Sequence, residues 1–145
     1  MRLVIQKVKE ATVNIDNKKY SYIKSGLLCF VAFCDHDLED DLSWAINKLL
    51  KLKLFNNNGS IQNMGLELLI VSQFTLFANI KKGTKPSWVK AAKPGFAKKL
   101  YALFINLLKD KHPGKIKTGV FGADMKVQLI NDGPVTLIID TKNKQ

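Results

Sequence analysis

Two short polar segments interrupt apolar runs of the chain and carry its best candidates for chemistry. The first, Ser72-Gln73-Phe74-Thr75, follows the apolar residues 68–71. Hydroxyl and amide groups at the end of a strand can donate hydrogen bonds to a bound ester, and backbone N–H groups there can stabilise an oxyanion. A strand with one solvated face would explain the same four residues, so both interpretations stay open.

The second polar segment, Asn131-Asp132-Gly133-Pro134, separates the apolar stretches 125–130 and 135–140. Asn, Asp and Gly are common in β-hairpin turns, so a hairpin is one interpretation. Pro134 cannot donate a backbone hydrogen bond to a neighbouring strand, which favours an edge strand or a specialised turn.

The usual catalytic constellations are absent from the sequence. It has no nucleophile elbow, P-loop, dinucleotide-binding or zinc-protease motif. His36 lies in an acidic turn and His112 precedes a Pro-Gly pair, so a solvated loop position is the simpler interpretation of each. Cys29 and Cys34 share one apolar run and lack a second pair or a histidine to complete a metal site. We therefore expect no side-chain triad, cofactor or metal.

Charge is distributed unevenly along the chain. The formal net charge is +11, yet residues 68–109 contain no Asp or Glu. This acid-free segment holds Lys81, Lys82, Lys85, Lys90, Lys93, Lys98, Lys99 and Lys109. Such segregation favours a polyphosphate partner. A compositional bias toward lysine would explain the net charge, since the chain has a single arginine, but it would not explain the acid-free segment. We expect nucleic-acid binding.

Length and composition indicate one domain of an ordinary globular protein. The 145 residues are 46% hydrophobic, so residues 1–140 can form one core, followed by a loose polar C-terminal tail at 141–145. No run approaches the roughly 20 apolar residues of a membrane helix, and the first residues turn polar too soon for a signal peptide. We therefore expect a cytoplasmic protein that does not enter a membrane.

The periodicity predicts the elements that position the two polar segments. Alternation predicts a strand over 2–16, and the chain continues with predicted strands at 20–24, 27–34, 68–77, 116–121, 125–130 and 135–140. A helix capped by Asp37 should bury Leu42, Ile46, Leu49 and Leu50. A second helix, ended at 112–114, should bury Phe96, Leu100, Leu103 and Leu107. The fold class is α+β, with a mostly antiparallel or mixed sheet and two main amphipathic helices.

With these segments in place, the sequence closely resembles the D-aminoacyl-tRNA deacylase (D-tyrosyl-tRNA(Tyr) deacylase) family. The two polar segments match its S-Q-x-x-T and N-x-G-P-x-T motifs. Residues 4–8 resemble its V-I-Q-R-V opening, residues 81–88 its basic K-G-x-x-P loop, and residues 118–125 its T-G-x-F-G-A-D-M run. Each motif alone is weak, but their ordered set covers nearly the whole chain.

The resemblance implies a barrel-like homodimeric enzyme that hydrolyses the ester of D-aminoacyl-tRNA, and of glycyl-tRNA mischarged on tRNA(Ala). The Ser72-to-Thr75 segment would be catalytic. The terminal 2′-hydroxyl of the tRNA would assist, and main chain near Gln73 and Phe74 would stabilise the oxyanion. A cis Gly133–Pro134 bond from the partner subunit would reject L-amino acids.

The resemblance also assigns residues around the substrate. Phe121, Met125 and Asn131 would form the pocket for amino acid and adenosine, although core packing explains the first two equally well. Lys81, Lys82 and Lys85 would contact the tRNA backbone. Lys7 stands where the family usually has an arginine that would brace the Gly-Pro turn, and one flexible charge is a weaker brace.

Three alternatives remain open from the sequence. A non-catalytic RNA-binding module would explain the lysines, and a small-molecule esterase could act through Thr75. A related branch of the fold has a trans Gly-Pro bond and edits an L-amino acid, but the motifs favour the D-specific branch.

Overall fold

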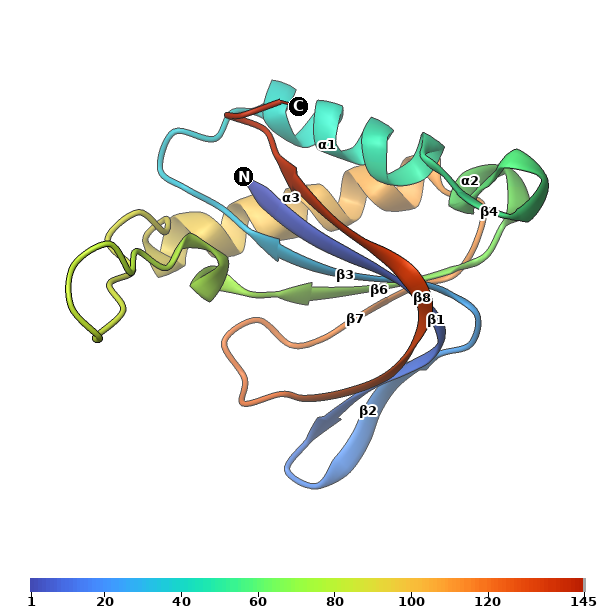
Figure 1. The fold of residues 1–145 in the computed structure, drawn as a ribbon, viewed down its shortest axis with the longest axis horizontal. Coiled ribbons are helices and arrows are strands. Elements are labelled where there is room, and N and C mark those ends of the chain that lie inside the picture. Colours follow the sequence, from blue (N-terminus) through green and yellow to red (C-terminus); the bar gives the residue numbers. More distant parts are fainter. Residues whose placement is uncertain (145) are drawn as a thin grey trace.

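A strongly curved six-stranded sheet with two long helices on one face makes up the molecule in a computed structural model, which describes residues 1–144 (Figure 1). The strands are β1 (Arg2–Ile15), β2 (Lys18–Ile23), β3 (Gly26–Ala32), β4 (Lys53–Phe55), β5 (Gly59–Ser60), β6 (Glu67–Ser72), β7 (Ile116–Thr118) and β8 (Lys126–Asp140). The helices are α1 (Glu39–Lys51), α2 (Ile61–Met64) and α3 (Pro94–Lys111), and two 3₁₀ turns are η1 (Asn56–Asn58) and η2 (Phe74–Phe77). The predicted α+β class with a mixed, barrel-like sheet is confirmed.

The first strand organises the sheet. Residues 2–8 of β1 pair with β3, residues 11–15 pair with β2, and β8 runs along β1 over nearly its whole length, all antiparallel. Beyond β3 the sheet continues as β6 and then β7, both parallel to their neighbour. The ends of β3, β6 and β7 therefore lie along one edge of the sheet, and the first polar segment follows β6 there.

Strand β3 is buried on both faces, which explains its continuous apolar sequence. Leu27, Cys29 and Val31 pack with the helices in one core cluster, whereas Leu28 belongs to a second cluster on the inner side of the curved sheet. The second cluster also takes in Met125, which immediately precedes β8. The sheet thus separates two apolar layers.

Helix α1 buries the predicted face, since Leu42, Ile46, Leu49 and Leu50 are all excluded from solvent. Its predicted cap is wrong: Leu38, not Asp37, is the residue that precedes the helix. The Asp41 carboxylate, in the first turn, accepts a hydrogen bond from the Leu38 N–H at 2.9 Å and so satisfies the backbone donor of the N-cap residue.

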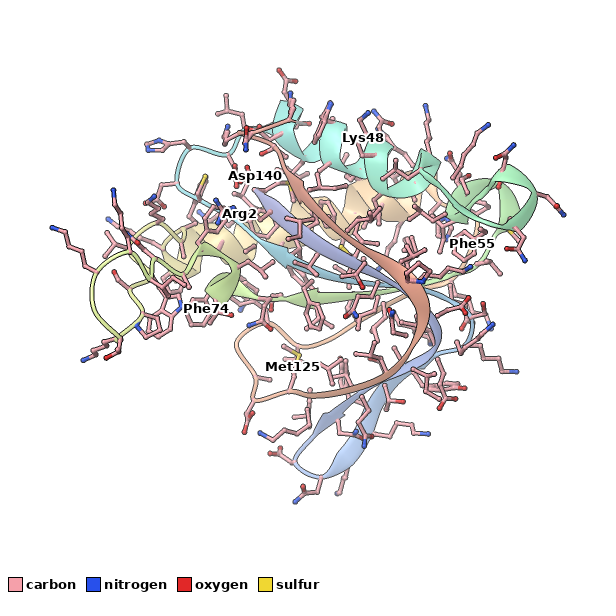
Figure 2. The ribbon with its side chains drawn as sticks, in the orientation of Figure 1. Arg2, Lys48, Phe55, Phe74, Met125 and Asp140 are labelled. Atoms are coloured by element: carbon pink, nitrogen blue, oxygen red, sulfur yellow. The ribbon has the colours of Figure 1, made fainter. Side chains whose placement is uncertain are left out.

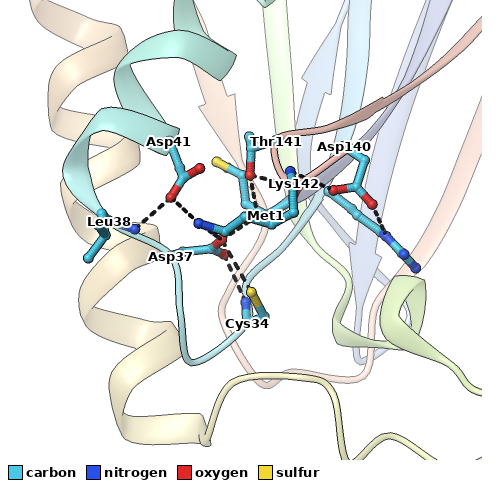
Figure 3. Close-up of polar contacts among 9 residues, drawn as sticks. Met1, Cys34, Asp37, Leu38, Asp41, Asp140, Thr141 and Lys142 are labelled. Carbon is cyan, nitrogen blue, oxygen red and sulfur yellow. Dashed lines mark hydrogen bonds and ion pairs between the residues drawn. The ribbon is translucent and has the colours of Figure 1, made fainter. Parts of the chain in front are cut away.

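Asp37 instead lies at the centre of a buried polar cluster (Figure 3). Its carboxylate accepts hydrogen bonds from the Met1 amino group and from the Cys34 backbone N–H. Thr141 joins the cluster, with its hydroxyl 2.7 Å from the Met1 nitrogen, and is itself buried. The prediction of a loose tail is therefore wrong for Thr141, because the end of β8 is tied to the start of β1; Gln145 lies outside the described residues.

Helix α3 is rotated from the predicted orientation, so that of the four residues predicted to be buried only Leu100 is fully so. Phe96 is 39% exposed, and Leu103 and Leu107 are only partly buried. The buried face consists of Ala97, Leu100, Tyr101, Phe104, Ile105 and Leu108. Tyr101 fixes this rotation, because its hydroxyl donates to the Ile70 carbonyl of β6 at 3.0 Å.

Residues 126–140 form one strand, so the predictions of two separate strands and of a possible hairpin turn between them are wrong. Gln6 of β1 pairs with Thr136 and Val8 pairs with Asn131, so that Lys7 alone faces the stretch 132–135. The Gly133–Pro134 bond is cis, and both residues are exposed. Within residues 1–144, β8 pairs only with β1, so Pro134 lies at a sheet edge as its missing N–H favours.

None of the helices described is both long enough and apolar enough to cross a membrane.

Candidate active site

A cavity of about 780 Å³ opens where β6 ends. Asp35 and three segments line it: the end of β6 with the start of η2, the stretch 88–97, and the stretch 121–127. The cavity brings together the predicted residues Ser72, Gln73, Phe74, Phe121 and Met125. Figure 2 labels Phe74 at the start of η2 and Met125 just before β8, and both line the cavity.

Parallel pairing explains why these segments meet. Residues 68–70 of β6 lie beside residues 116–118 of β7, so the chain that leaves β7 passes the chain that leaves β6. Phe121 then packs on Tyr101, with ring centroids 5.8 Å apart. Burial raises the pKa of Tyr101, so that its hydroxyl stays protonated and keeps its bond to β6.

The polar segment after β6 is held rigidly. The Gln73 N–H donates to the Val31 carbonyl at 2.8 Å, which extends the β3–β6 pairing by one residue. Arg2 fixes the far end of η2: its Nη1 donates to the Leu76 carbonyl at 3.0 Å, and its guanidinium lies 4.8 Å from the Phe77 ring centroid. Sequence analysis missed this role of Arg2, which has no motif to mark it.

Two backbone donors at the start of η2 are not used within this held segment. Within residues 1–144, neither the Phe74 N–H nor the Thr75 N–H has a hydrogen-bond partner. The first N–H groups of a helical turn are left free in this way, and they can bind a developing negative charge. The Gln73 N–H is already used by the Val31 carbonyl, so the free donors near Gln73 and Phe74 are the N–H groups of Phe74 and Thr75.

Thr75 is not arranged as an activated nucleophile. Its hydroxyl accepts a hydrogen bond from the Gln73 side-chain amide. No histidine or carboxylate of the described chain bonds to it, and it is not among the residues that line the cavity. An activated hydroxyl needs an adjacent base, so this arrangement does not favour an esterase that acts through Thr75.

The Gly133–Pro134 turn, an irregularity within β8 where its register with β1 shifts, lies elsewhere in the same protomer. Next to it, Asp132 forms ion pairs with Lys7 at 3.1 Å and Lys9 at 3.3 Å. The Lys7 ammonium, 5.3 Å from the Phe55 ring centroid, holds the pKa of the Asp132 carboxyl below its ordinary value. Figure 2 places Phe55 at the opposite end of the sheet from Phe74. The turn therefore contributes nothing to the cavity of its own protomer.

Asn131 completes the anchoring of this turn. Its side-chain oxygen accepts a long hydrogen bond from the Gln6 amide at 3.4 Å, and its own side chain is exposed. Within one protomer Asn131, like the turn, does not line the cavity in which the sequence predicted it.

The predicted phosphate-binding lysines lie on an exposed loop beside the cavity. Lys81, Lys82 and Lys85 are all solvent-exposed. The loop is closed at its base by two backbone hydrogen bonds between Asn79 and Ser87, at 2.7 and 3.1 Å.

Carboxylates at the cavity rim are engaged by basic or backbone groups. Asp35 accepts the Lys93 N–H at 3.2 Å, and Asp124 pairs with Lys126 at 2.7 Å. Across the described residues, no three His, Cys, Asp or Glu side chains are grouped so that they could hold a metal ion. The site thus offers backbone donors, aromatic walls and a basic rim.

This geometry defines an α+β protein with a rigid, donor-bearing strand end beside an aromatic cavity. Residues 4–140 match the model of the family described as D-Tyr-tRNA(Tyr) deacylase, and the chain belongs to that family.

Curated relatives agree over their full lengths. The chain is 44% identical to a D-aminoacyl-tRNA deacylase of Flavobacterium johnsoniae and 47% identical to one of Cytophaga hutchinsonii, with all of each chain covered. Among solved structures it is similar to the c-Myc DNA Unwinding Element Binding Protein, with a TM-score of 0.90 at 33% identity, covering 97% of this chain and 98% of that one. A probable eukaryotic D-amino acid tRNA deacylase shares the fold, with a TM-score of 0.82 at 19% identity over 95% of this chain and 97% of that one.

Proposed function

We propose that the chain hydrolyses the ester that joins a D-amino acid to the terminal ribose of tRNA. The observation that carries this proposal is the pair of free N–H groups at Phe74 and Thr75, at the start of η2, where Phe74 lines an aromatic cavity. Family membership supplies the substrate, and the exposed lysine loop beside the cavity supplies charge for its phosphates.

The chemistry needs no side-chain nucleophile. Water attacks the ester carbonyl carbon, the bond to the ribose oxygen breaks, and a free D-amino acid and tRNA leave. The negative charge that develops on the carbonyl oxygen is stabilised by the Phe74 and Thr75 N–H groups. The neighbouring 2′-hydroxyl of the terminal ribose orients the water and relays its proton, which the absence of a base beside Thr75 supports.

Selection for the D-hand comes from a second copy of the chain. The outer edge of β8 has no partner strand within residues 1–144, and Ile130 and Ile138 on it are 55% and 75% exposed. A further groove of about 620 Å³, lined in part by Trp44, Leu76 and Leu137, lies against the same strand. A homodimer that covers this edge carries each Gly133–Pro134 turn into the partner's cavity.

In that position the turn rejects an L side chain by collision, whereas a D side chain points away from it. Glycine lacks a side chain on either side, so glycyl-tRNA charged wrongly on tRNA(Ala) is also a substrate. Lys7, which stands where the family usually has an arginine, braces the turn through its ion pair with Asp132, and Lys9 pairs with the same carboxylate. The enzyme acts in the cytoplasm, where aminoacyl-tRNA is made.

The test is deacylation of tRNA charged with D-tyrosine and, separately, with L-tyrosine. We expect loss of the D ester alone. Survival of both esters at a protein concentration equal to that of the charged tRNA would refute the proposal and favour the non-catalytic RNA-binding module. Cleavage of both would keep the hydrolysis and refute the chiral role of the turn.

A further inference from the structure

We infer that Trp88 stacks on the base of the nucleotide that precedes the terminal adenosine, so that the loop over 80–90 holds the single-stranded 3′ end of the tRNA outside the cavity. This inference rests on the proposed function and adds a binding surface to it. The cavity receives the aminoacylated adenosine, and the strand that leads to it must leave across the rim.

Trp88 occupies that rim. It lines the cavity, packs against Phe74 with ring centroids 6.0 Å apart and planes at 66°, and is still 40% exposed. A large aromatic side chain that is fixed on one side and open on another provides a platform for a base, since every base has a π-face. Phe74 packs on Trp88 and is also the first residue of η2, so the Trp88 ring lies next to the segment that bears the free N–H groups.

The backbone around Trp88 is fixed before any ligand binds. On one side Ser87 is paired with Asn79, at 2.7 and 3.1 Å. On the other side the Ala91 N–H donates to the Trp88 carbonyl at 2.9 Å, and the Ala92 N–H donates to the Phe33 carbonyl of the core at 2.8 Å. Little conformational freedom is lost when a base stacks on a ring held in this way.

The charge around Trp88 identifies the occupant as nucleic acid. Lys81, Lys82, Lys85 and Lys90 are exposed in the same loop, and no acidic residue occurs from 68 to 109. The two rim carboxylates are engaged, Asp35 by the Lys93 N–H and Asp124 by Lys126. An aromatic ring among free lysines fits a single strand, because stacking holds its bases while the cations neutralise its phosphates.

Kinetics on two substrates isolate this contact. With D-tyrosyl-tRNA, we expect Trp88→Ala to raise KM about tenfold at unchanged kcat, the effect of one lost stack. Trp88→Phe should recover most of the loss. With D-tyrosyl-adenosine, which lacks the preceding nucleotide, the loss in Trp88→Ala should be much smaller than with D-tyrosyl-tRNA. Ile80→Ala is the matched control, because Ile80 is 73% exposed in the same loop and does not line the cavity.

The outcomes separate this inference from the proposed function. Equal losses on both substrates would mean that Trp88 only shapes the cavity, and no loss on either would mean that it touches no substrate; both overturn the inference. The slope of KM against salt should not change in Trp88→Ala, because stacking releases no counterions. A changed slope would also contradict it.

A binding measurement tests the contact without catalysis. In a Trp44→Phe background Trp88 is the only tryptophan. We expect a short single-stranded RNA that ends in CCA to quench its fluorescence, and the same RNA without its last two nucleotides to do so less. No quenching refutes the inference even if deacylation is confirmed, whereas quenching in a protein that hydrolyses no ester would refute only the deacylase proposal.

Discussion

Replacing Gly133 with alanine tests whether the Gly133–Pro134 turn serves catalysis or only the stability of the protomer. A Cβ built at Gly133 meets only the Asn131 side-chain nitrogen, at 3.7 Å, which is an ordinary van der Waals contact. The backbone there is also outside the left-handed region that disfavours alanine. We therefore expect the free energy of unfolding to change by no more than about 0.5 kcal/mol.

Activity should respond very differently. If the Gly133 backbone meets the α-carbon of the substrate in the partner's cavity, a methyl group there displaces the ester by about 1 Å. A misplacement of that size costs about 100-fold in rate. The assay is kcat/KM on D-tyrosyl-tRNA, measured beside thermal unfolding at several protein concentrations, because a weakened dimer makes the unfolding temperature depend on concentration.

Gly26→Ala is the matched control for a glycine that the fold itself requires. A Cβ at Gly26 would lie 1.9 Å from the Glu67 carbonyl oxygen where β3 pairs with β6, so this variant should unfold at a much lower temperature. If Gly133→Ala loses stability in the same way, the turn is a structural element of the protomer. If it keeps full activity, the turn does not meet the substrate, and the cross-subunit proposal is wrong.

Three further outcomes follow from the site. Thr75→Ala should keep most of the activity, whereas wild-type enzyme should fail on tRNA that ends in 2′-deoxyadenosine; the reverse pattern, measured as single-turnover rates, would restore Thr75 as nucleophile. Replacing both Lys82 and Lys85 with alanine should raise the Kd for tRNA and lower the slope of log Kd against log salt by about one per lost phosphate contact. Asp132→Asn should increase hydrolysis of the L ester relative to the D ester. Because the folded-state pKa of Asp132 is depressed below 3.8, its ion pairs form fully above that value and are lost only as the pH falls through the lower pKa. Wild-type discrimination should thus stay constant from about pH 5 to about pH 8, and a decline within that window would contradict the bracing role.

The two long helices show what the sequence can and cannot predict. In α1 the apolar residues form a single stripe, so Leu42 and Ile46 could only face inward. In α3 apolar side chains surround more of the helix, and the 3.6-residue period fits a face with Leu103 as well as one with Phe104. The choice depends on a tertiary contact, the Tyr101 hydroxyl on the Ile70 carbonyl, which periodicity does not encode.

The cavity residues also fall into those that the sequence predicts and those that only tertiary contacts bring together. Ser72 to Phe74 were predicted because a polar group after an apolar strand is visible in one dimension. That Phe121 and Met125 reach the same cavity depends on the parallel pairing of β6 with β7, a long-range contact between segments far apart in the chain. Trp88 was missed for a similar reason, since nothing in a lysine-rich loop marks which residue folds back on Phe74.

The conformation of the Asn131-to-Pro134 segment is set by the strand with which it pairs, β1. Its composition fits a hairpin turn, but β1 places Lys7 alone opposite 132–135, so the extra residues must leave the ladder. Asp132 ties this projection to β1 on its inner side, while Gly133 and Pro134 stay exposed on an edge with no further strand in residues 1–144. A projection that is anchored to β1 and exposed on its outer side is suited to a contact beyond its own protomer, and the cavity that it would enter in the proposed dimer lies at the other end of the sheet. In a two-fold dimer one interface would complete both cavities at once, so the proposed activity should fall with dilution in parallel with the fraction of dimer.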